Sequence, residues 1–493
     1  MNRHKAPRTA ETWRMLIGGR RVESVTGESR EIHTPARRGH VLARVPEADA
    51  QDVDLAVAAA RAAWPEWRDQ HFTVRQRALL KIAEAIEARR EDLARITAAD
   101  TGNAIRTQAR PEASTLADLF RYFGGVAGEV KGTTLPAGSS QLQYTRQEPL
   151  GVVGAILPWN SPLLIAGFKV PAALAAGNTM VLKAAEDAPL SILMLAEICQ
   201  EFLPEGVLNV ITGSGSTAGT ALVGHPGVDK ISFTGSTEVG RQIARRCAER
   251  LAPVSLELGG KNPSIVFPGT ISDRLVDGLL ASSRVTRQGQ SCTAGSRLFL
   301  HREVHDEVLE RLVARLEDLR VGDPLDDATD IGAVINETQH RSIQDYIDAG
   351  LGNSALTLQT GGTPPATGPL SEGYFHVPTV FSGADNTFRL SREEIFGPVL
   401  VAIPWTDVDD VIQMANDSAY GLAAYVWGDD INAALGVAHR LEAGWVQVNQ
   451  GGGQMMGQSF GGYKQSGLGR EVSLESMIAG FTQTKQINIH LAR

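Results

Sequence analysis

Cys292 stands in a stretch that suits a reactive thiol, Gln288-Gly-Gln-Ser-Cys-Thr-Ala-Gly-Ser296. Gly289 allows the backbone to turn, and the small residues after the cysteine leave space behind its sulfur. The other two cysteines, Cys199 and Cys247, lie in segments typical of apolar helices. Cys292 is therefore the cysteine placed to meet a ligand as a nucleophile. The alternative is a buried structural cysteine, because a thiol reacts only where its surroundings lower its pKa.

Two further polar residues could act together with such a thiol. Glu257 lies in the apolar strand predicted over residues 254–258, where burial would raise its pKa and suit it to be a general base. The alternative is a buried pair with Lys261 or an arginine. Asn160 follows the predicted strand 152–157, and its amide could hold a developing oxyanion. A turn-forming asparagine is the alternative there.

Other segments have features of a dinucleotide site. Gly235-Ser-Thr-Glu-Val-Gly240 lies between a strand and a helix, where backbone amides and hydroxyls could meet a pyrophosphate, although a simple helix cap is the alternative. Lys183 and Glu186 follow a strand end and could bind ribose hydroxyls, with a surface ion pair as the alternative. The Gly213 to Gly219 pattern resembles a dinucleotide fingerprint, but its last spacing is one residue too long.

The elements that must position these residues alternate between strands and helices. Unbroken apolar strands alternating with helices from residue 151 onward indicate parallel sheets covered on both faces. We therefore predict an α/β fold with two parallel-sheet domains. The Rossmann-like cofactor-binding domain is expected over residues 1–125 and 150–258, and the catalytic domain over residues 259–460.

Smaller elements are expected around these domains. Residues 31–34 and 41–45 are expected to be strands of a peripheral sheet, and the apolar spacing over residues 73–99 predicts one long helix. Residues 140–150 and 481–491 alternate apolar and polar side chains, which predicts two half-exposed strands that pair. Because exposed strands need partners, we assign residues 126–149 and 475–493 to a small oligomerisation sheet of a homodimer or homotetramer.

Composition excludes several classes of function. The 493 residues carry a net charge of −9, which disfavours binding to nucleic acid. Three cysteines without a Cys-x-x-Cys pair make neither a disulfide framework nor a cysteine zinc site, and no metal is expected. The polar first residues do not resemble a signal peptide, and polar residues and prolines interrupt the apolar region 161–182. We expect a cytoplasmic protein with no membrane partner.

Five segments match, in order and spacing, the NAD(P)-dependent aldehyde dehydrogenase superfamily, in its non-acylating, class 1/2-like form. The resemblance covers nearly the whole chain and implies the same three-part fold. The segments are Pro158-Trp-Asn160, Leu256-Glu-Leu-Gly-Gly-Lys261, Gly289-Gln-Ser-Cys292, Glu393-Glu-Ile-Phe-Gly-Pro398 and Phe460-Gly-Gly-Tyr-Lys-Gln-Ser-Gly-Leu-Gly-Arg-Glu471.

This resemblance implies roles for individual residues. Cys292 would be the nucleophile, Glu257 the general base and Asn160 the oxyanion donor. Glu394 would contact the nicotinamide ribose, and Phe396 would lie beside the ring. Glu186 favours NAD over NADP, because a carboxylate repels a 2′-phosphate, although NADP is possible. The expected cofactor-binding residues are Ile156, Trp159, Lys183, Glu186, Gly235, Ser236, Thr237, Glu238, Gly240, Glu394 and Phe396.

The expected reaction is oxidation of an aldehyde to a carboxylic acid through a hemithioacetal and a thioester on Cys292. A CoA-acylating enzyme is an alternative, but it would not need Glu257 to activate water. A cysteine esterase would need no NAD, and a non-catalytic binding protein would not need these three residues. Two departures from the family pattern are Ala184, where proline is frequent, and Arg287, which adds charge before the thiol.

The substrate is expected to be a small-molecule aldehyde that is hydrophobic or aromatic. The residues expected around it are mostly apolar, and none of them is an arginine or lysine that could hold a carboxylate. A semialdehyde or betaine aldehyde is therefore the less favoured alternative. The expected pocket residues are Leu164, Phe168, Ser291, Thr293, Met455, Met456 and Phe460.

Overall fold

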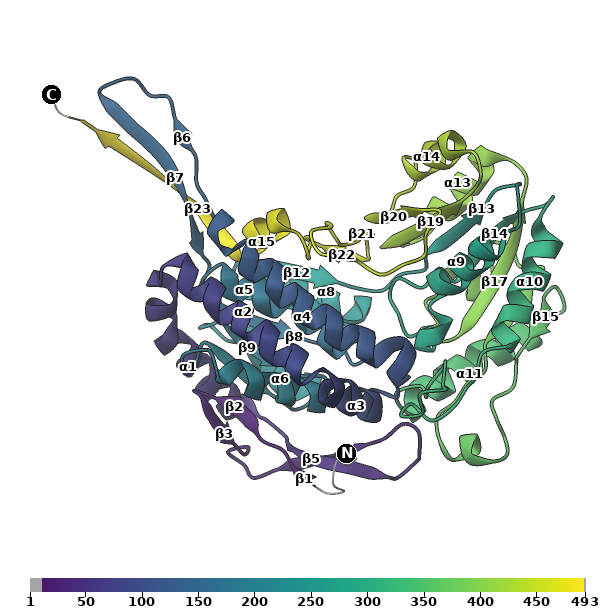
Figure 1. Cartoon of the computed structure of the whole chain (residues 1–493), viewed down its shortest axis with the longest axis horizontal. Coiled ribbons are helices and arrows are strands. Elements are labelled where there is room, and N and C mark those ends of the chain that lie inside the picture. Colours follow the sequence, from purple (N-terminus) through teal and green to yellow (C-terminus); the bar gives the residue numbers. More distant parts are fainter. Residues whose placement is uncertain (1–10, 492–493) are drawn as a thin grey trace.

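The computed structural model describes residues 11–491 and confirms the predicted α/β fold, with two large sheets and a projecting smaller one (Figure 1). The polar start of the chain and its last two residues, which the predicted domain ranges include, lie outside the described residues. Over residues 11–491, no helix has both the length and the apolar character needed to span a membrane.

The first body is built on an eight-stranded sheet whose central strands are parallel. On the central strand β8, Val153 and Ala155 face one hydrophobic core, while Val152 and Ile156 face another. Burial on both faces explains the unbroken apolar strands of the sequence. In sheet order the strands are β22 (Gly467–Leu468), β12 (Val254–Glu257), β11 (Lys230–Thr234), β8 (Val152–Ile156), β9 (Thr179–Lys183), β10 (Leu208–Ile211), β2 (Met15–Ile17) and β3 (Arg20–Val22).

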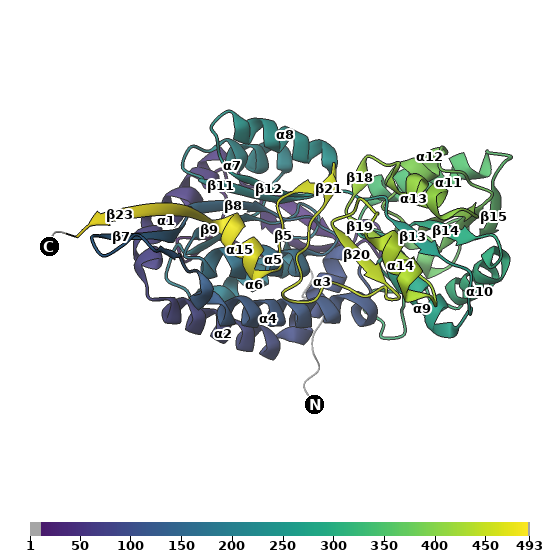
Figure 2. The same cartoon turned by 90° about the horizontal axis from the view of Figure 1, so that it is seen from above.

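Helices cover both faces of this sheet, with α7 and α8 on one side and α2 and α4 on the other (Figure 2). One face is covered by α1 (Ala50–Asp69), α7 (Thr220–Gly224) and α8 (Thr237–Ala248). The other carries α2 (Phe72–Ala88), α3 (Arg90–Thr101), α4 (Arg110–Gly125), α5 (Pro162–Ala175) and α6 (Leu190–Gln200).

The prediction of a single helix over residues 73–99 is wrong, because the chain forms two helices, α2 and α3, with a break at Arg89. Arg89 has φ −110° and ψ 18°, outside the helical region. Leu93 and Ile96 of α3 are still buried in the same core as α2. A bend of this kind keeps the apolar spacing on each side, so periodicity does not reveal it.

A three-stranded N-terminal sheet lies at the edge of this body and confirms the strands predicted near residues 31–34 and 41–45. Its order is β1-β5-β4. The strands are β1 (Glu11–Thr12), β5 (Val41–Pro46) and β4 (Ser29–His33).

The second body contains a seven-stranded sheet, parallel except for its edge strand β15. Its residues also alternate between two cores, one beneath α9 (Asp273–Ser283) and α10 (His305–Glu317). The other lies beneath α11 (Glu337–Leu351), α13 (Val408–Asn416) and α14 (Ile431–Ala438). In sheet order the strands are β15 (Thr357–Thr360), β16 (Thr379–Ser382), β17 (Val399–Trp405), β14 (Arg297–His301), β13 (Pro263–Val266), β19 (Ala423–Trp427) and β20 (Trp445–Val448).

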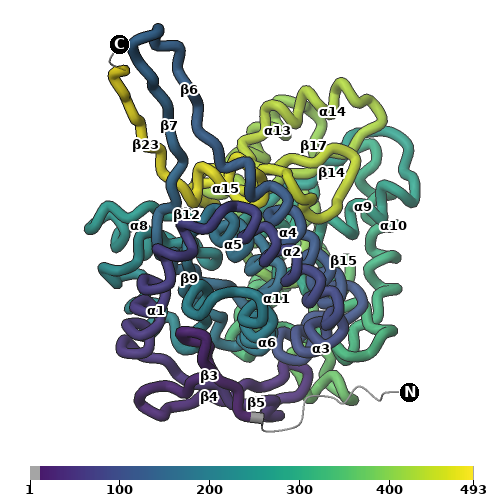
Figure 3. The backbone as a smooth tube through the Cα atoms, turned by 60° about the vertical axis from the view of Figure 1, so that its left-hand side comes forward, coloured from purple at the N-terminus to yellow at the C-terminus, as the bar shows by residue number. Residues whose placement is uncertain are grey.

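A further small sheet projects away from both bodies (Figures 1 and 3). It pairs β7 (Gln141–Pro149) with β23 (Thr482–His490), and β6 (Thr134–Leu135) adds a short third strand. The predicted pairing of the segments 140–150 and 481–491 is therefore confirmed. Helix α15 (Leu474–Phe481) connects β23 to the first body.

Candidate active site

The backbone around Cys292 is held in one conformation by its neighbours. Gln288 and Gly289 both have positive φ, and a side chain on Gly289 would collide with the carbonyl of Gly397. The Cys292 carbonyl accepts a hydrogen bond from Asn262 Nδ2 at 2.8 Å. Only glycine fits this close approach, which explains Gly289 in the cysteine stretch.

The Cys292 thiol is partly exposed, whereas Cys199 and Cys247 are buried. Burial raises the pKa of Cys292 to about 12, and the nearby carboxylates of Glu394 and Glu257 act in the same direction. The positive charges of two nearby arginines act in the opposite direction and lower this pKa. The chain fold thus brings two of the predicted acids into the electrostatic range of the predicted nucleophile.

Glu257 is a buried carboxylate without a hydrogen-bond partner in the described chain. It ends β12 and is only 4% exposed, and neither of its carboxylate oxygens accepts a hydrogen bond from residues 11–491. Burial raises its pKa well above the usual value, and the charge of Glu471 adds to this. The alternative of a buried ion pair with Lys261 is not formed, which leaves Glu257 available to accept a proton.

Behind Glu257 lies a buried ion pair that sequence reasoning did not identify. Lys169 Nζ lies 2.6 Å from Glu471 Oε1 and donates to Ser232 Oγ at 3.0 Å. Lys169 lowers the pKa of Glu257, opposing Glu471. The available signal was a lysine inside the otherwise apolar helix α5.

The Asn160 side chain points at the nucleophile segment. Its Nδ2 donates to the carbonyl of Gln290 at 2.9 Å, which fixes the amide two residues before Cys292. The backbone carbonyl of Asn160 accepts hydrogen bonds from Asn103 Nδ2 at 3.0 Å and from Gln108 Nε2 at 3.2 Å. Because an amide group has two N–H donors, one remains for an oxyanion.

Trp159, Glu394 and Phe396 lie at the junction between the two bodies. The Trp159 and Phe396 rings meet edge to face at 5.4 Å. Glu394 accepts from the Gly260 N–H at 2.9 Å, and burial raises its pKa to about 7. Phe396 has φ +55°, and Gln339 Nε2 supports this conformation by donating to its carbonyl at 3.0 Å.

A cavity of about 480 Å³ opens between α8 and the end of β8. Its mainly apolar walls fit a flat nucleotide base. Ile156 is the one predicted cofactor residue that lines it. The lining residues are Ile156, Gly215, Ser216, Gly219, Thr220, Val223, Phe233, Val239, Gln242, Ile243 and Arg246. The Gly213 to Gly219 pattern was the sequence signal for part of this wall.

Lys183 and Glu186 lie beside the lining residues Gly219 and Gly215, and Ser236 caps the helix next to the cavity. The Lys183 ammonium is buried, which lowers its pKa to about 8, and Glu186 accepts hydrogen bonds from Gly215 N and Arg30. Ser236 caps α8 by accepting from Val239 N at 3.4 Å, as the simpler interpretation predicted.

Three predicted cofactor residues in the first turns of α8 make different contacts. Thr237 Oγ1 lies 3.4 Å from the Gln465 carbonyl, while Glu238 is exposed. Gly240 packs where a side chain would collide with Leu258.

Aromatic side chains gather in the core against which Cys292 packs. The Phe168 and Phe460 rings lie 6.0 Å apart, and Tyr425 donates to the Thr293 carbonyl at 2.8 Å. Ser291 and Thr293 hydroxyls lie 3.1 Å apart. Leu164 is partly buried in the same core as Phe168. By contrast, Met455 and Met456 are exposed on the loop between β20 and β22.

Two arginines near the thiol already have partners. Arg287 Nη2 lies 3.4 Å from Glu112 Oε1. Arg284 donates to the carbonyls of Gly451 at 3.1 Å and Gly452 at 2.6 Å. Both arginines lower the pKa of Cys292. Arg287 is the charge expected from the sequence, whereas Arg284 and Glu112 were not expected, although two arginines three residues apart before the cysteine were a visible signal.

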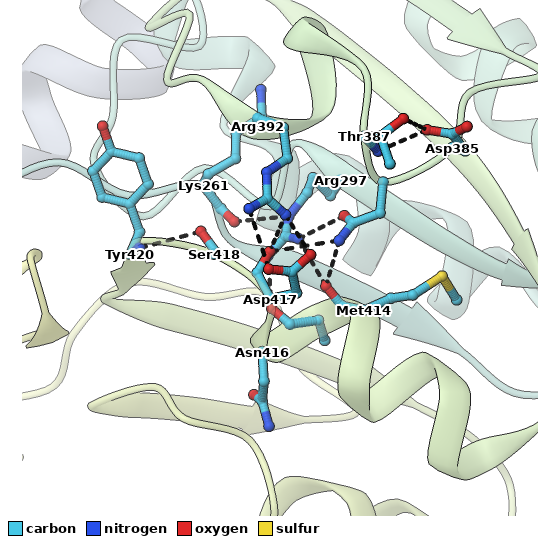
Figure 4. A network of polar contacts seen from close by, with 12 residues as sticks. Lys261, Arg297, Asp385, Thr387, Arg392, Met414, Asn416, Asp417, Ser418 and Tyr420 are labelled. Carbon is cyan, nitrogen blue, oxygen red and sulfur yellow. Dashed lines mark hydrogen bonds and ion pairs between the residues drawn. The ribbon is translucent and has the colours of Figure 1, made fainter.

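Arg297, at the start of β14, links the turn at Lys261 to Met414 of α13 (Figure 4). This buried guanidinium donates to the carbonyls of Lys261 at 2.9 Å and Met414 at 3.2 Å. The neighbouring pair Arg392–Asp417 closes the network at 2.7 Å. Through Lys261, this network supports the turn that connects Glu257 to β13.

Comparisons with known proteins agree on one family. The sequence model of the aldehyde dehydrogenase family matches residues 22–487. Hydroxyisobutyraldehyde dehydrogenase of Mycolicibacterium austroafricanum is 42% identical over 485 residues, 98% of this chain and 95% of that protein. The NAD-dependent aldehyde dehydrogenase structure from Sinorhizobium meliloti has a TM-score of 0.95 at 37% identity, with coverage of 100% and 97%. The NAD+ complex of the Bacillus cereus enzyme has a TM-score of 0.94 at 38% identity, with coverage of 98% and 97%.

Proposed function

This chain belongs to the aldehyde dehydrogenase family, and we propose that it oxidises an aldehyde to a carboxylic acid with NAD as the electron acceptor. The observation that carries the proposal is the convergence of Cys292, Asn160 and the unpartnered Glu257 at the junction of the two bodies. The similar Bacillus cereus protein was solved as an NAD+ complex, which supports the choice of cofactor.

Cys292 begins the reaction by attacking the aldehyde carbon as a thiolate. Arg284 and Arg287 favour that thiolate, because their positive charges lower the pKa that burial has raised. The free N–H of the Asn160 amide, with the Cys292 backbone N–H, holds the oxyanion of the hemithioacetal. NAD, when bound, would supply the hydride acceptor, and loss of hydride from the hemithioacetal carbon would leave a thioester on Cys292.

Glu257 completes the reaction by taking a proton from the water that attacks the thioester. Its two free oxygens and raised pKa suit it to this step. The carboxylic acid leaves, and the thiol is regenerated. The pair Lys169–Glu471 sets the charge behind Glu257 without touching the reacting atoms.

Two groups of residues would hold NAD. The apolar cavity that includes Ile156 takes the adenine, and Lys183 and Glu186 bind the adenosine ribose hydroxyls at its rim. The segment Gly235–Gly240 at the start of α8 approaches the pyrophosphate. At the domain junction, Trp159, Glu394 and Phe396 surround the nicotinamide and its ribose.

A hydrophobic or aromatic aldehyde fits the substrate side best. Leu164 and Cys292 pack against the core that contains the buried aromatic cluster of Phe168, Phe460, Trp445 and Tyr425, so the surroundings of the thiol are apolar. Arg287 is paired with Glu112 and Arg284 with the loop carbonyls, so part of each guanidinium is already engaged within the chain rather than directed at a substrate carboxylate. We place the aldehyde between Leu164, Phe168 and Phe460, with Ser291 and Thr293 near its carbonyl and Met455 and Met456 at the entrance.

This placement of cofactor and substrate suggests a role for each part of the chain. We propose that residues 1–125 and 150–258 bind the cofactor, that residues 259–460 form the catalytic domain, and that residues 126–149 and 475–493 join subunits of a homodimer or homotetramer. Cys199, Cys247 and Cys292 are all free thiols, which favours a reducing compartment such as the cytoplasm.

Replacing the nucleophile tests this function. Cys292→Ala should lower NADH formation from aldehydes at least about a thousandfold, because the covalent step is lost. The measurement is NADH absorbance over a panel of aliphatic, aromatic and semialdehyde substrates. Cys199→Ala, which replaces a buried thiol on α6, is the matched control and should keep its rate. Substantial turnover by the Cys292→Ala enzyme would refute the proposal.

A further inference from the structure

Arg30 lies at the rim of the proposed adenosine site, although it belongs to the separate N-terminal sheet. From β4 its guanidinium reaches the segment after β9, where Nη1 lies 3.2 Å from Glu186 Oε2. Its Nε lies 2.9 Å from Glu47 Oε2. The side chain is 33% exposed, so solvent and ligands can reach it.

Arg30 changes the charge balance of this rim. Glu186 and Glu47 bring two negative charges, and Arg30 joins Lys183 to bring two positive charges. Without Arg30 the four-residue group would carry a net negative charge, which would repel a phosphate. With Arg30 the group is balanced.

The two acidic partners of Arg30 differ in how firmly they are held. Glu47 contacts Arg30 through both of its oxygens and also accepts from Ser214 N at 2.7 Å. Glu186 is 37% exposed and touches only one nitrogen of the guanidinium, while its other oxygen accepts from Gly215 N. Because an exposed ion pair contributes little stability, Glu186 can turn to solvent while Glu47 keeps Arg30 in place.

We propose that Arg30 enables this rim to accept a 2′-phosphorylated adenosine, so that the protein binds NADP as well as NAD. The inference rests on the proposed cofactor site. With Glu186 turned inward, the rim offers a carboxylate to a ribose hydroxyl. When Glu186 turns outward, it frees Arg30 Nη1 and the Gly215 N–H, two donors that face the same point and suit a phosphate.

Calorimetric titration of the whole chain with two nucleotides tests the proposal without turnover. ADP has no 2′-phosphate, whereas adenosine 2′,5′-bisphosphate has one. The wild type should bind both with Kd values within about tenfold of each other. Arg30→Leu should weaken the bisphosphate about ten- to hundredfold, the usual effect of losing a hydrogen bond to a charged group, and weaken ADP less than about threefold.

Two further variants sharpen the test. Glu186→Gln should strengthen bisphosphate binding more when Arg30 is present than in the Arg30→Leu background, because loss of the repulsive charge acts in both while the freed donor exists only in the first. Arg44→Leu removes a similar exposed pair, Arg44–Glu31, on the neighbouring strand β5 and should change neither Kd.

Three results would overturn the role of Arg30. One is a wild type that ADP saturates and the bisphosphate does not bind. The second is an Arg30→Leu variant that loses both nucleotides equally, which would indicate a structural role only. The third is bisphosphate binding that Arg30→Leu leaves unchanged. If the wild type binds neither nucleotide, the proposed cofactor site itself fails, and this result is distinguishable from the other three.

Discussion

At the scale of single residues, the site depends on groups that burial has left without partners. Glu257 has two buried oxygens with no hydrogen bond from the described chain, and an isolated buried carboxylate is costly unless it takes up a proton. Glu471 and Lys169 act on it in opposite directions. The pH at which Glu257 becomes a base is therefore set by residues that do not touch the substrate.

The pH profile of kcat should report this arrangement. In its proposed role Glu257 acts only when deprotonated, so we expect activity to fall as pH drops through its raised pKa. Glu471→Gln removes a negative charge and leaves Lys169, so it should lower the pKa of Glu257 and move the acidic limb of the profile to lower pH.

The measurement is steady-state NADH formation across the pH range. Glu475→Gln, an exposed acid on α15, should leave the limb in place, and Glu257→Gln should remove the limb with most of the turnover. A limb that stays or moves upward in Glu471→Gln would contradict this assignment.

At the scale of elements, Arg284 at the end of α9 contacts both the cysteine stretch and the loop after β20. Arg284 terminates the helix with φ +57°, and the following short turn, Val285–Arg287, leads to the cysteine stretch. The Arg284 side chain extends to the glycine-rich loop after β20. One residue thus fixes the helix end and the loop that we place at the substrate entrance.

Arg284→Met should release this loop. The variant loses two hydrogen bonds from a charged donor to Gly451 and Gly452, so the KM for the aldehyde should rise about tenfold, while the Kd for NAD stays the same. Limited proteolysis should show faster cleavage within residues 449–458. Arg274→Met, an exposed arginine on the same helix, is the control. An unchanged KM with an unchanged cleavage rate would contradict the proposed anchor.

At the scale of the whole molecule, the projecting sheet is too small to be stable through its own packing. Leu142 and Ile489 lie directly opposite each other in its strands and are each 38% exposed. We expect the proposed second subunit to cover this apolar cross-strand pair.

Replacing this pair should dissociate the assembly. Leu142→Gln with Ile489→Gln should lower the mass in solution, measured by light scattering, to that of a single chain. Asn488→Lys lies on the opposite face of the same strand and is the control. If the double variant keeps the wild-type mass, the contact between subunits lies elsewhere.

The sequence by itself determined the fold class, the paired strands of the projecting sheet and the residues expected to carry the chemistry. These depend on local information, such as the unbroken apolar strands and the glycines around Cys292. The break at Arg89 escaped it, because a bend does not disturb the apolar spacing on either side.

Only the tertiary structure decided how the charged side chains are paired. Arg30 meets Glu186 across 156 positions, Lys169 meets Glu471 across 302, and Arg284 meets Gly451 across 167. No periodicity links residues so far apart, because chain folding alone brings them within hydrogen-bond distance. The sequence therefore predicts which residues could do chemistry, and the fold determines which charges surround them.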